Sequence, residues 1–334
     1  MSDSADTGIG RDATYLKTVI DFAKAVPLTA TILRILPSFC RPVVAPFIAH
    51  FAHSLERKHN RLLRSTVLDR QKLVVADASK KPRDLLQWTM DRAMVSGSSF
   101  EMRTETAASR MAIINFAAIH TSTITITNTI LDLTASTPAN LMALRCESVS
   151  ALENTGGSWS KTTVQKLVKH DSAIRESSRL STIGSLSVRR EVIAPGGLEA
   201  ADGTKLPFGC WVAVAGSAAH YDDAYHPNAA SYLPFRFCED NETVNPEDSS
   251  VRPTSRSNQG FVTTSEKNQG FGHGKHACPG RFFAASELKL LLSYMMLKYD
   301  FQMLPQRPAG RWIGENLVPP MKATIQVRRR KEVV

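Results

Sequence analysis

The stretch Phe271-Gly272-His273-Gly274-Lys275-His276-Ala277-Cys278-Pro279-Gly280 places a single cysteine among three glycines. A helical pattern follows at once, from Arg281 to Leu291. A thiolate at Cys278 would therefore face the amino end of a helix, whose partial positive charge favours an ionised sulfur. The glycines permit backbone torsions and close approaches that other residues would block. The pattern predicts a loop on which a flat ligand lies against the backbone while Cys278 reaches its metal.

Several interpretations of this loop compete. A cysteine-ligated haem is held in this way. His273, His276 and Cys278 are also candidate zinc ligands, although their spacing does not give the paired geometry that zinc usually takes. An inert buried thiol is the default for any free cysteine. A phosphate-binding loop is excluded, because the stretch lacks a G-K-[ST] or G-x-G-x-x-G spacing and no strand clearly precedes it.

These residues resemble the haem-binding loop of the cytochrome P450 superfamily, whose pattern is F-G-x-G-x-R-x-C-x-G. The resemblance implies haem b as cofactor, with Cys278 as the axial ligand of its iron. It also implies that other loop residues contact the haem: Phe271, Gly272, Gly274, His276 and Gly280. His276 stands where the family usually has an arginine on a haem propionate, and a histidine can still donate to a carboxylate.

A second motif is Glu176-Ser177-Ser178-Arg179, within a segment from Lys161 to Leu180 whose apolar residues recur at helical spacing. Residues three apart share a helix face, so Glu176 and Arg179 can pair. Taken alone, such a pair is a common surface feature worth about 0–1 kcal/mol. The resemblance implies instead a buried pair that binds a third residue, Arg236, and that fixes geometry more than it adds net stability.

A third motif, Phe116 to Ser122, resembles the central helix that crosses the haem in this superfamily. The resemblance implies that Thr121 hydrogen-bonds dioxygen and delivers protons, and that His120 takes the place of the usual acid. The period alone indicates something else, because threonine and isoleucine alternate from Thr121 to Ile130 as in a strand. The uncharged stretch 111–131 is long enough for a membrane span, but its polar residues favour a buried helix in a globular protein.

The remaining segments fit the same family with one exception. Pro195 to Phe237 resembles the small β-rich region, with a turn at Asp202-Gly203 and a strand from Trp211. Trp88 to Arg92 has the spacing of a propionate-binding motif but the wrong place in the chain, so it is interpreted as an ordinary amphipathic segment.

Composition limits the environment and the partners. Five scattered cysteines in 334 residues, without a secretory signal, indicate free thiols in a reducing, intracellular compartment. The net charge of +10 is dispersed and lacks a basic–aromatic array, which argues against nucleic acid. It suits an acidic electron donor, and the resemblance implies an NADPH–cytochrome reductase.

The course of the chain gives further expectations. Residues 1–11 are expected to be a disordered tail, Ala13 to Leu36 a helix, and 239–270 a polar surface loop. The apolar, proline-interrupted stretch from Pro42 to Leu55 is too short to span a bilayer. It is expected to pack in the core, with contact at a membrane surface as the alternative. The chain is accordingly placed in the cytoplasm or at the periphery of the endoplasmic reticulum.

We therefore expect a mainly α protein with small β-sheets, a single haem-thiolate monooxygenase domain over 1–334 that lacks the amino-terminal part of the family's chain. Its details resemble the fungal ent-kaurene-oxidase-like, secondary-metabolism branch. That resemblance implies hydroxylation of an apolar small molecule of terpenoid type, with electrons passed from NADPH through a reductase. The alternative is a truncated homologue without activity.

Overall fold

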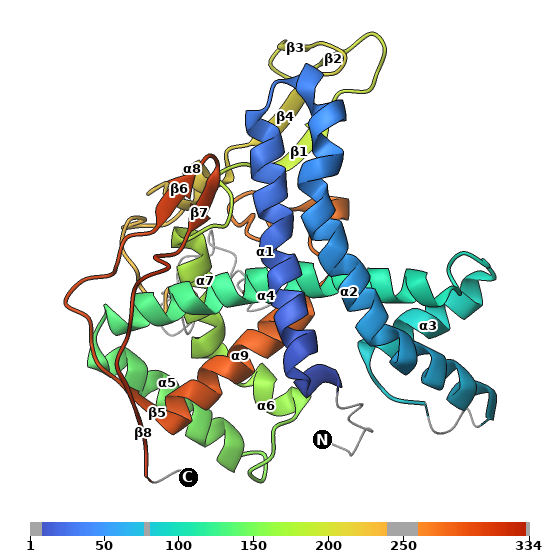
Figure 1. Cartoon of the computed structure of the whole chain (residues 1–334). Helices are drawn as coiled ribbons and strands as arrows, with labels where there is room; N and C mark the ends of the chain where they lie inside the picture. Colours follow the sequence, from blue (N-terminus) through green and yellow to red (C-terminus); the bar gives the residue numbers. More distant parts are fainter. Residues whose placement is uncertain (1–8, 77–80, 239–259, 332–334) are drawn as a thin grey trace. The chain divides into compact units, whose positions relative to one another are not determined.

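The computed structural model describes residues 9–76, 81–238 and 260–331 (Figure 1). The chain forms two compact units, residues 1–120 and 121–334. Helix α4 (Thr104–Thr134) contributes residues to both units. The expected single domain over 1–334 stays a prediction.

The described part of the first unit is helical. Its elements are η1 (Ile9–Arg11), α1 (Ala13–Ile35), η2 (Ser38–Cys40), α2 (Arg41–Ala76), α3 (Leu85–Ser96) and the start of α4. Helices α1 and α2 lie side by side as an antiparallel pair (Figure 1). Residues from all four α-helices form one apolar core, among them Val19, Leu63, Val67, Met90 and Ala108. The predicted helix at 13–36 is confirmed by α1. The first eight residues of the expected disordered tail lie outside the described residues, and its last three, Ile9–Arg11, instead form the short helix η1.

The expectation that the stretch 42–55 packs in the core is wrong. It forms the first turns of α2, where Val43, Phe47 and Phe51 are 60–79% exposed. The buried positions of α2, such as Ala52 and Leu63, lie on the opposite side of the helix. The sequence of the stretch is apolar on both sides, so helical periodicity could not tell which side faces the core.

The second unit packs helices around the carboxyl-terminal half of α4. Its helices are α5 (Pro138–Glu153), α6 (Lys161–Gln165), α7 (Val168–Leu180), α8 (Gly216–His220), η6 (Gly274–His276) and α9 (Arg281–Lys298). Its core combines side chains from α4, α5, α7 and α9, including Leu133, Leu144, Ile174, Leu288 and Leu292, each at most 1% exposed. No described helix is both long and apolar enough to cross a membrane.

Within residues 121–238 and 260–331, the second unit also has four small antiparallel sheets of two strands each. The pairs are β1 (Ser187–Glu191) with β4 (Trp211–Val214), β2 (Leu198–Glu199) with β3 (Lys205–Leu206), β5 (Tyr299–Phe301) with β8 (Val327–Arg329), and β6 (Arg311–Ile313) with β7 (Asn316–Val318). The predicted turn at Asp202-Gly203 joins β2 to β3, with Gly203 at φ +83°. The expected fold class, mainly α with small β-sheets, is confirmed. Of the expected surface loop, 239–259 lies outside the described residues.

The alternating stretch 121–130 is helical throughout. Threonine hydroxyls donate back to carbonyls one turn earlier, as in Thr129 Oγ1 to Thr125 O at 2.9 Å. Ile126 and Leu133 meanwhile enter the core of the second unit. Packing of the helix therefore overrides the strand preference of the isolated residues.

The expected helix 161–180 is interrupted at Lys166-Leu167, between α6 and α7. Glu147 of α5 explains the restart, because its carboxylate accepts from the amides of Lys169 and His170 at 2.7 and 3.1 Å. These are first-turn N–H groups of α7 that have no partner within the helix. The break depends on a residue of another helix and leaves no trace in local periodicity.

We predict that Leu292→Ala lowers the free energy of unfolding by about 3 kcal/mol, because it opens a cavity in the core of the second unit. Leu292 is fully buried, whereas its neighbour Leu291 on α9 is 41% exposed. The matched variant Leu291→Ala should cost less than about 1 kcal/mol. Urea unfolding followed by circular dichroism compares the two, and equal losses would contradict the packing described.

Candidate functional site

The loop from Phe271 to Gly280 is held by its own backbone. The amide of Cys278 donates to Phe271 O at 2.8 Å, and that of Ala277 donates to Gly274 O at 3.0 Å. Gly272 and Gly274 have φ of +69° and +70°, a left-handed conformation that favours glycine. The ring of Phe271 packs on Phe261, with centroids 4.8 Å apart, and joins the loop to the core.

Cys278 lies three residues before the start of α9, and its carbonyl accepts from Arg281 Nη1 at 2.8 Å. The thiol is partly buried and in no disulfide, and Sγ has no hydrogen-bond partner within the described residues. A Cβ built on Gly280 would lie 3.9 Å from Sγ, so this glycine keeps the space beside the sulfur free of side chain. One available sulfur in a glycine-walled cradle fits the donor set of a cysteine-ligated haem.

The described residues do not offer the set of ligands that the zinc interpretation requires. Among the residues that the structure describes, no group of three or more His, Cys, Asp or Glu side chains is placed to share a metal ion. His273 pairs with Thr264 Oγ1 at 3.1 Å, and the side chain of His276 is exposed.

The structure brings Glu176, Arg179 and Arg236 together. Both carboxylate oxygens of Glu176 accept from Arg179, each at 2.8 Å, and Oε1 also accepts from Arg236 Nε at 2.9 Å. The backbone amide of Leu233 donates a fourth bond at 3.2 Å. Glu176 is fully buried. Burial by itself would raise the pKa of this carboxyl, but the hydrogen bonds and charge of Arg179, with Arg236, outweigh it and hold the pKa below its usual value.

The two arginines also fix the backbone of the segment 220–231. Arg179 donates to the carbonyls of His220 and Ala229, and Arg236 donates to those of Pro227 and Asn228. His220 ends α8, and the other three carbonyls lie in a segment without helix or strand, so the guanidinium groups supply hydrogen bonds that regular structure does not give there.

His220 connects this triad to the cysteine loop, a role that the sequence did not indicate. Its ring Nε2 accepts from the backbone amide of Gln269 at 3.2 Å, two residues before Phe271. Burial, reinforced by the positive charges nearby, lowers the pKa of His220 to about 4, so the ring is neutral and can accept. The local sequence carries no signal for this contact, because Gln269 lies 49 positions away.

Helix α4 carries the two predicted catalytic residues, and it does not bring them together. Within the first unit, the His120 ring nitrogen Nε2 pairs with the carbonyl of Ala23, and the ring meets Phe116 edge-on at 5.7 Å. Thr121, the next residue of the helix, is exposed. Consecutive helical residues do not face each other, so His120 and Thr121 point in different directions.

An acid from α9 reaches the hydroxyl that follows Thr121 in the chain. Ser122 Oγ donates to Glu287 Oε2 at 2.9 Å, linking α4 to α9 within the second unit. Glu287 lies nine residues after Cys278 on the helix that the cysteine loop leads into. Sequence reasoning missed this residue, because a glutamate on an amphipathic helix carries no signal by itself.

Comparison with known proteins agrees with this geometry. The sequence matches the Cytochrome P450 family over residues 13–324, and the chain belongs to that family. Cytochrome P450 monooxygenase 151 of Postia placenta is 33% identical over 96% of this chain and 62% of its own length. Cytochrome P450 monooxygenase gloP of Glarea lozoyensis is 33% identical over 97% of this chain and 61% of its own. The chain thus spans about three-fifths of the length of these curated relatives.

We predict that Glu176→Gln lowers the free energy of unfolding by about 3–5 kcal/mol, because it leaves two buried guanidinium groups without their counter-charge. Glu153→Gln, at an exposed position of α5, is the matched control and should cost less than about 0.5 kcal/mol.

The difference between wild type and Glu176→Gln should also depend on pH. A carboxyl whose pKa is lowered by folding stabilises fully above the ordinary glutamate pKa of 4.5, and it loses this contribution as the pH falls through its folded-state value. Urea unfolding at pH 7 and across the acid range measures the difference. A gap that stays constant into strong acid would show that the triad charge is not its source.

Proposed function

We propose that this chain is the haem-binding part of a haem-thiolate monooxygenase that oxidises an apolar small molecule. The observation that supports this most directly is Cys278, whose sulfur is partly buried, unbonded within the described residues and flanked by glycine before α9. Membership of the Cytochrome P450 family supports the same conclusion.

In this proposal Cys278 ligates the iron of haem b, and Phe271, Gly272, Gly274 and Gly280 line its cradle. The exposed His276 donates to a haem propionate. When bound, such a haem supplies the dioxygen chemistry, because the thiolate ligand donates electron density that favours O–O cleavage. The protein holds the loop in place through Phe271 in the core and through His220, which ties it to the Glu176 triad.

Protons are delivered from α4 in this proposal. Thr121 supplies the hydroxyl, and Glu287 holds a carboxylate one residue away through Ser122. His120 is the weaker candidate, because its Nε2 is already engaged by Ala23 O. Glu287 is thus an acid that contacts a hydroxyl of α4, that of Ser122, and we propose it in the role that the sequence analysis gave to His120.

Electrons come from NADPH through an NADPH–cytochrome reductase. The loop carries the exposed Lys275, and the whole chain has a net charge of +10. Such a surface attracts an acidic partner and speeds its docking.

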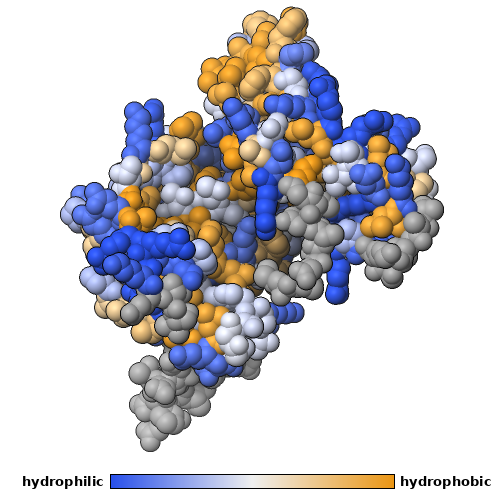
Figure 2. All heavy atoms as spheres, turned by 60° about the horizontal axis from the view of Figure 1, so that its bottom comes forward, coloured by the Kyte–Doolittle hydropathy of each residue, from blue (hydrophilic) through white to orange (hydrophobic). Residues whose placement is uncertain are grey.

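Contact with a membrane surface is supported by the first unit. Hydrophobic residues reach the surface in several places (Figure 2). The end of α1, η2 and the start of α2 carry an exposed group: Leu28, Ile35, Phe39, Val43, Phe47 and Phe51. No acidic residue occurs between Asp21 and Glu56, whereas lysine and arginine do. An apolar surface with basic neighbours suits the interface of an anionic membrane. We therefore place the protein at the periphery of the endoplasmic reticulum.

For the substrate we propose an apolar molecule of terpenoid type, made in fungal secondary metabolism. The support is the resemblance to the ent-kaurene-oxidase-like branch in the Ala-Ala-Ile-His-Thr run at 117–121.

We predict that the reduced, haem-loaded chain gives the thiolate-type carbon monoxide difference band and that Cys278→Ser abolishes it, because serine cannot supply the sulfur ligand. Cys146→Ser, at an exposed position of α5, should leave the band unchanged. Circular dichroism of each variant checks that helix content is kept.

A band retained in Cys278→Ser would show that another atom ligates the iron. A wild-type chain that takes up no haem under the same conditions would favour the alternative, a homologue without activity.

A further inference from the structure

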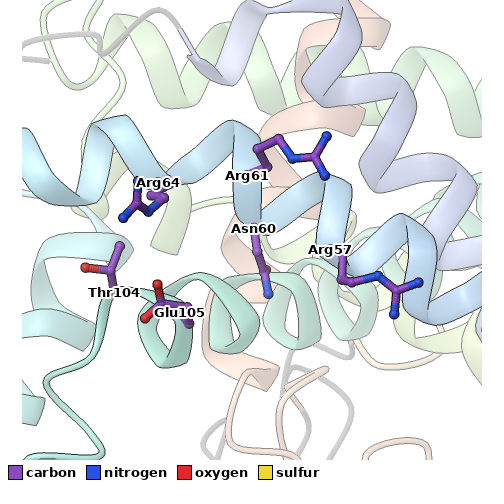
Figure 3. Close-up of a pocket in the computed structure, with 6 residues that line it drawn as sticks. All are labelled: Arg57, Asn60, Arg61, Arg64, Thr104 and Glu105. Atoms are coloured by element: carbon purple, nitrogen blue, oxygen red, sulfur yellow. The ribbon is translucent and has the colours of Figure 1, made fainter.

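A pocket of about 320 Å³ lies within the first unit, between α2 and the start of α4 (Figure 3). Its lining residues are Arg57, Asn60, Arg61, Arg64, Thr104 and Glu105. The haem-thiolate proposal uses none of them, since they all belong to residues 1–120.

Three of the six residues that line this pocket are arginines. Arg57, Arg61 and Arg64 recur at helical spacing, so their Cα atoms lie along one side of α2, and their side chains extend in different directions (Figure 3). Within the described residues these three guanidinium groups make no hydrogen bond or ion pair with the protein. Like charges four apart on a helix destabilise it, by about 0.2–0.5 kcal/mol a pair. Glu105 is the one acidic side chain of the lining, so an excess of two positive charges remains.

The amino end of α4 adds a partial positive charge to that of the arginines. The helix begins at Thr104 and runs for 31 residues, so its first amides present a partial positive charge at the pocket. Guanidinium groups beside a helix amino end make an arrangement that favours anions.

The floor of the pocket is fixed by a polar network. Asn60 Nδ2 donates to Ser109 Oγ of α4 at 2.8 Å, and Asn60 Oδ1 lies 3.2 Å from His59 Nδ1. His59 is fully buried, and its Nε2 lies 3.2 Å from Tyr15 Oη of α1. Burial lowers the pKa of His59, so the ring stays neutral and adds no charge. The backbones of α2 and α4 at the pocket are therefore held together before any ligand arrives, while the arginine side chains are exposed.

We infer that this pocket binds a phosphate-bearing anion, a phosphomonoester or diphosphate group. Arginine's planar fork matches phosphate oxygens in pairs, which a set of lysines would not do. The volume lies at the lower end of the range for small-ligand sites, which suits a head group rather than an extended molecule. Glu105 opposes the anion and limits its affinity. The shared chemistry covers a free phosphate compound and a phospholipid head group alike.

Isothermal titration calorimetry of the 334-residue chain with sodium pyrophosphate, at constant ionic strength, tests the site. We expect saturable binding that weakens about tenfold or more in Arg61→Gln/Arg64→Gln, since each guanidinium contributes a charge-assisted bond. Lys58→Gln, an exposed residue of α2 outside the lining, and Arg92→Gln, exposed on α3, are matched controls for lost charge and should bind as wild type does.

The sign of the effect at Glu105 is a sharper test. Glu105→Gln should bind pyrophosphate about threefold more tightly or better, because it removes the opposing charge. General loss of folding cannot produce tighter binding.

A second arm distinguishes the sources of the phosphate. Co-sedimentation with phosphatidylcholine vesicles, with and without phosphatidic acid, is compared between wild type and Arg61→Gln/Arg64→Gln. Pyrophosphate binding without a vesicle difference identifies a soluble ligand, and an arginine-dependent vesicle difference identifies a lipid head group. If neither ligand binds, or if the double variant binds both as wild type does, the inference is overturned. Neither arm requires haem, so the result is independent of the monooxygenase proposal.

Discussion

The buried carboxylate of Glu176 is the constraint on which the second unit depends. It accepts four hydrogen bonds, from two arginines and one backbone amide, and it is fully buried. Through Arg179 and Arg236 the same group holds five carbonyl groups, those of His220, Pro227, Asn228, Ala229 and Ser231. A long segment without regular structure thereby gains the hydrogen bonds that a sheet or helix would otherwise provide. His220 in turn accepts a hydrogen bond from the amide of Gln269, which precedes the cysteine loop, and so connects the loop to the triad.

The triad of Glu176, Arg179 and Arg236 fixes the conformation of the chain around it more than it adds to the free energy of unfolding. Taking three charges out of water costs several kcal/mol per ion, and their attraction repays this only when the hydrogen bonds are nearly complete. Here both carboxylate oxygens are used, and the arginines also find carbonyl partners. An apolar cluster of the same volume would hold α7 equally well. It would not select one conformation for the carbonyls that surround it.

The sequence predicted the features that depend on local spacing or on a family pattern. The helix α1 and the fold class are of this kind. It did not predict features that depend on a partner far along the chain. The break before α7 needs Glu147, and the contact of Ser122 needs Glu287, 165 residues later. The outward side of α2 was missed for another reason: with apolar residues on both sides of a helix, only the packed structure shows which side is buried.

A second buried carboxylate, that of Asp132, shows that the number of arginines in contact decides the direction of the pKa shift. Asp132 of α4 is nearly as buried as Glu176, but among the described residues one guanidinium, that of Arg307, reaches it, together with Ser177 Oγ at 2.6 Å. Burial therefore prevails and raises the pKa of Asp132, to which the negative charge of Glu176 contributes. The pKa of Glu176 is lowered in the same interior, because two arginines and an amide face it.

These opposite shifts give the two carboxyls opposite effects on stability as the pH falls. Folding lowers the pKa of Glu176, so its contribution to stability is lost as the pH falls through its folded-state value. Folding raises the pKa of Asp132, so the folded protein binds this proton more readily than the unfolded chain does, and protonation of Asp132 favours the folded state. Arg307 also holds the chain after β5 to α4 through Asn128, a contact that does not depend on the charge of Asp132. The acid sensitivity of the second unit therefore comes from the triad and the segment that it holds, rather than from Asp132.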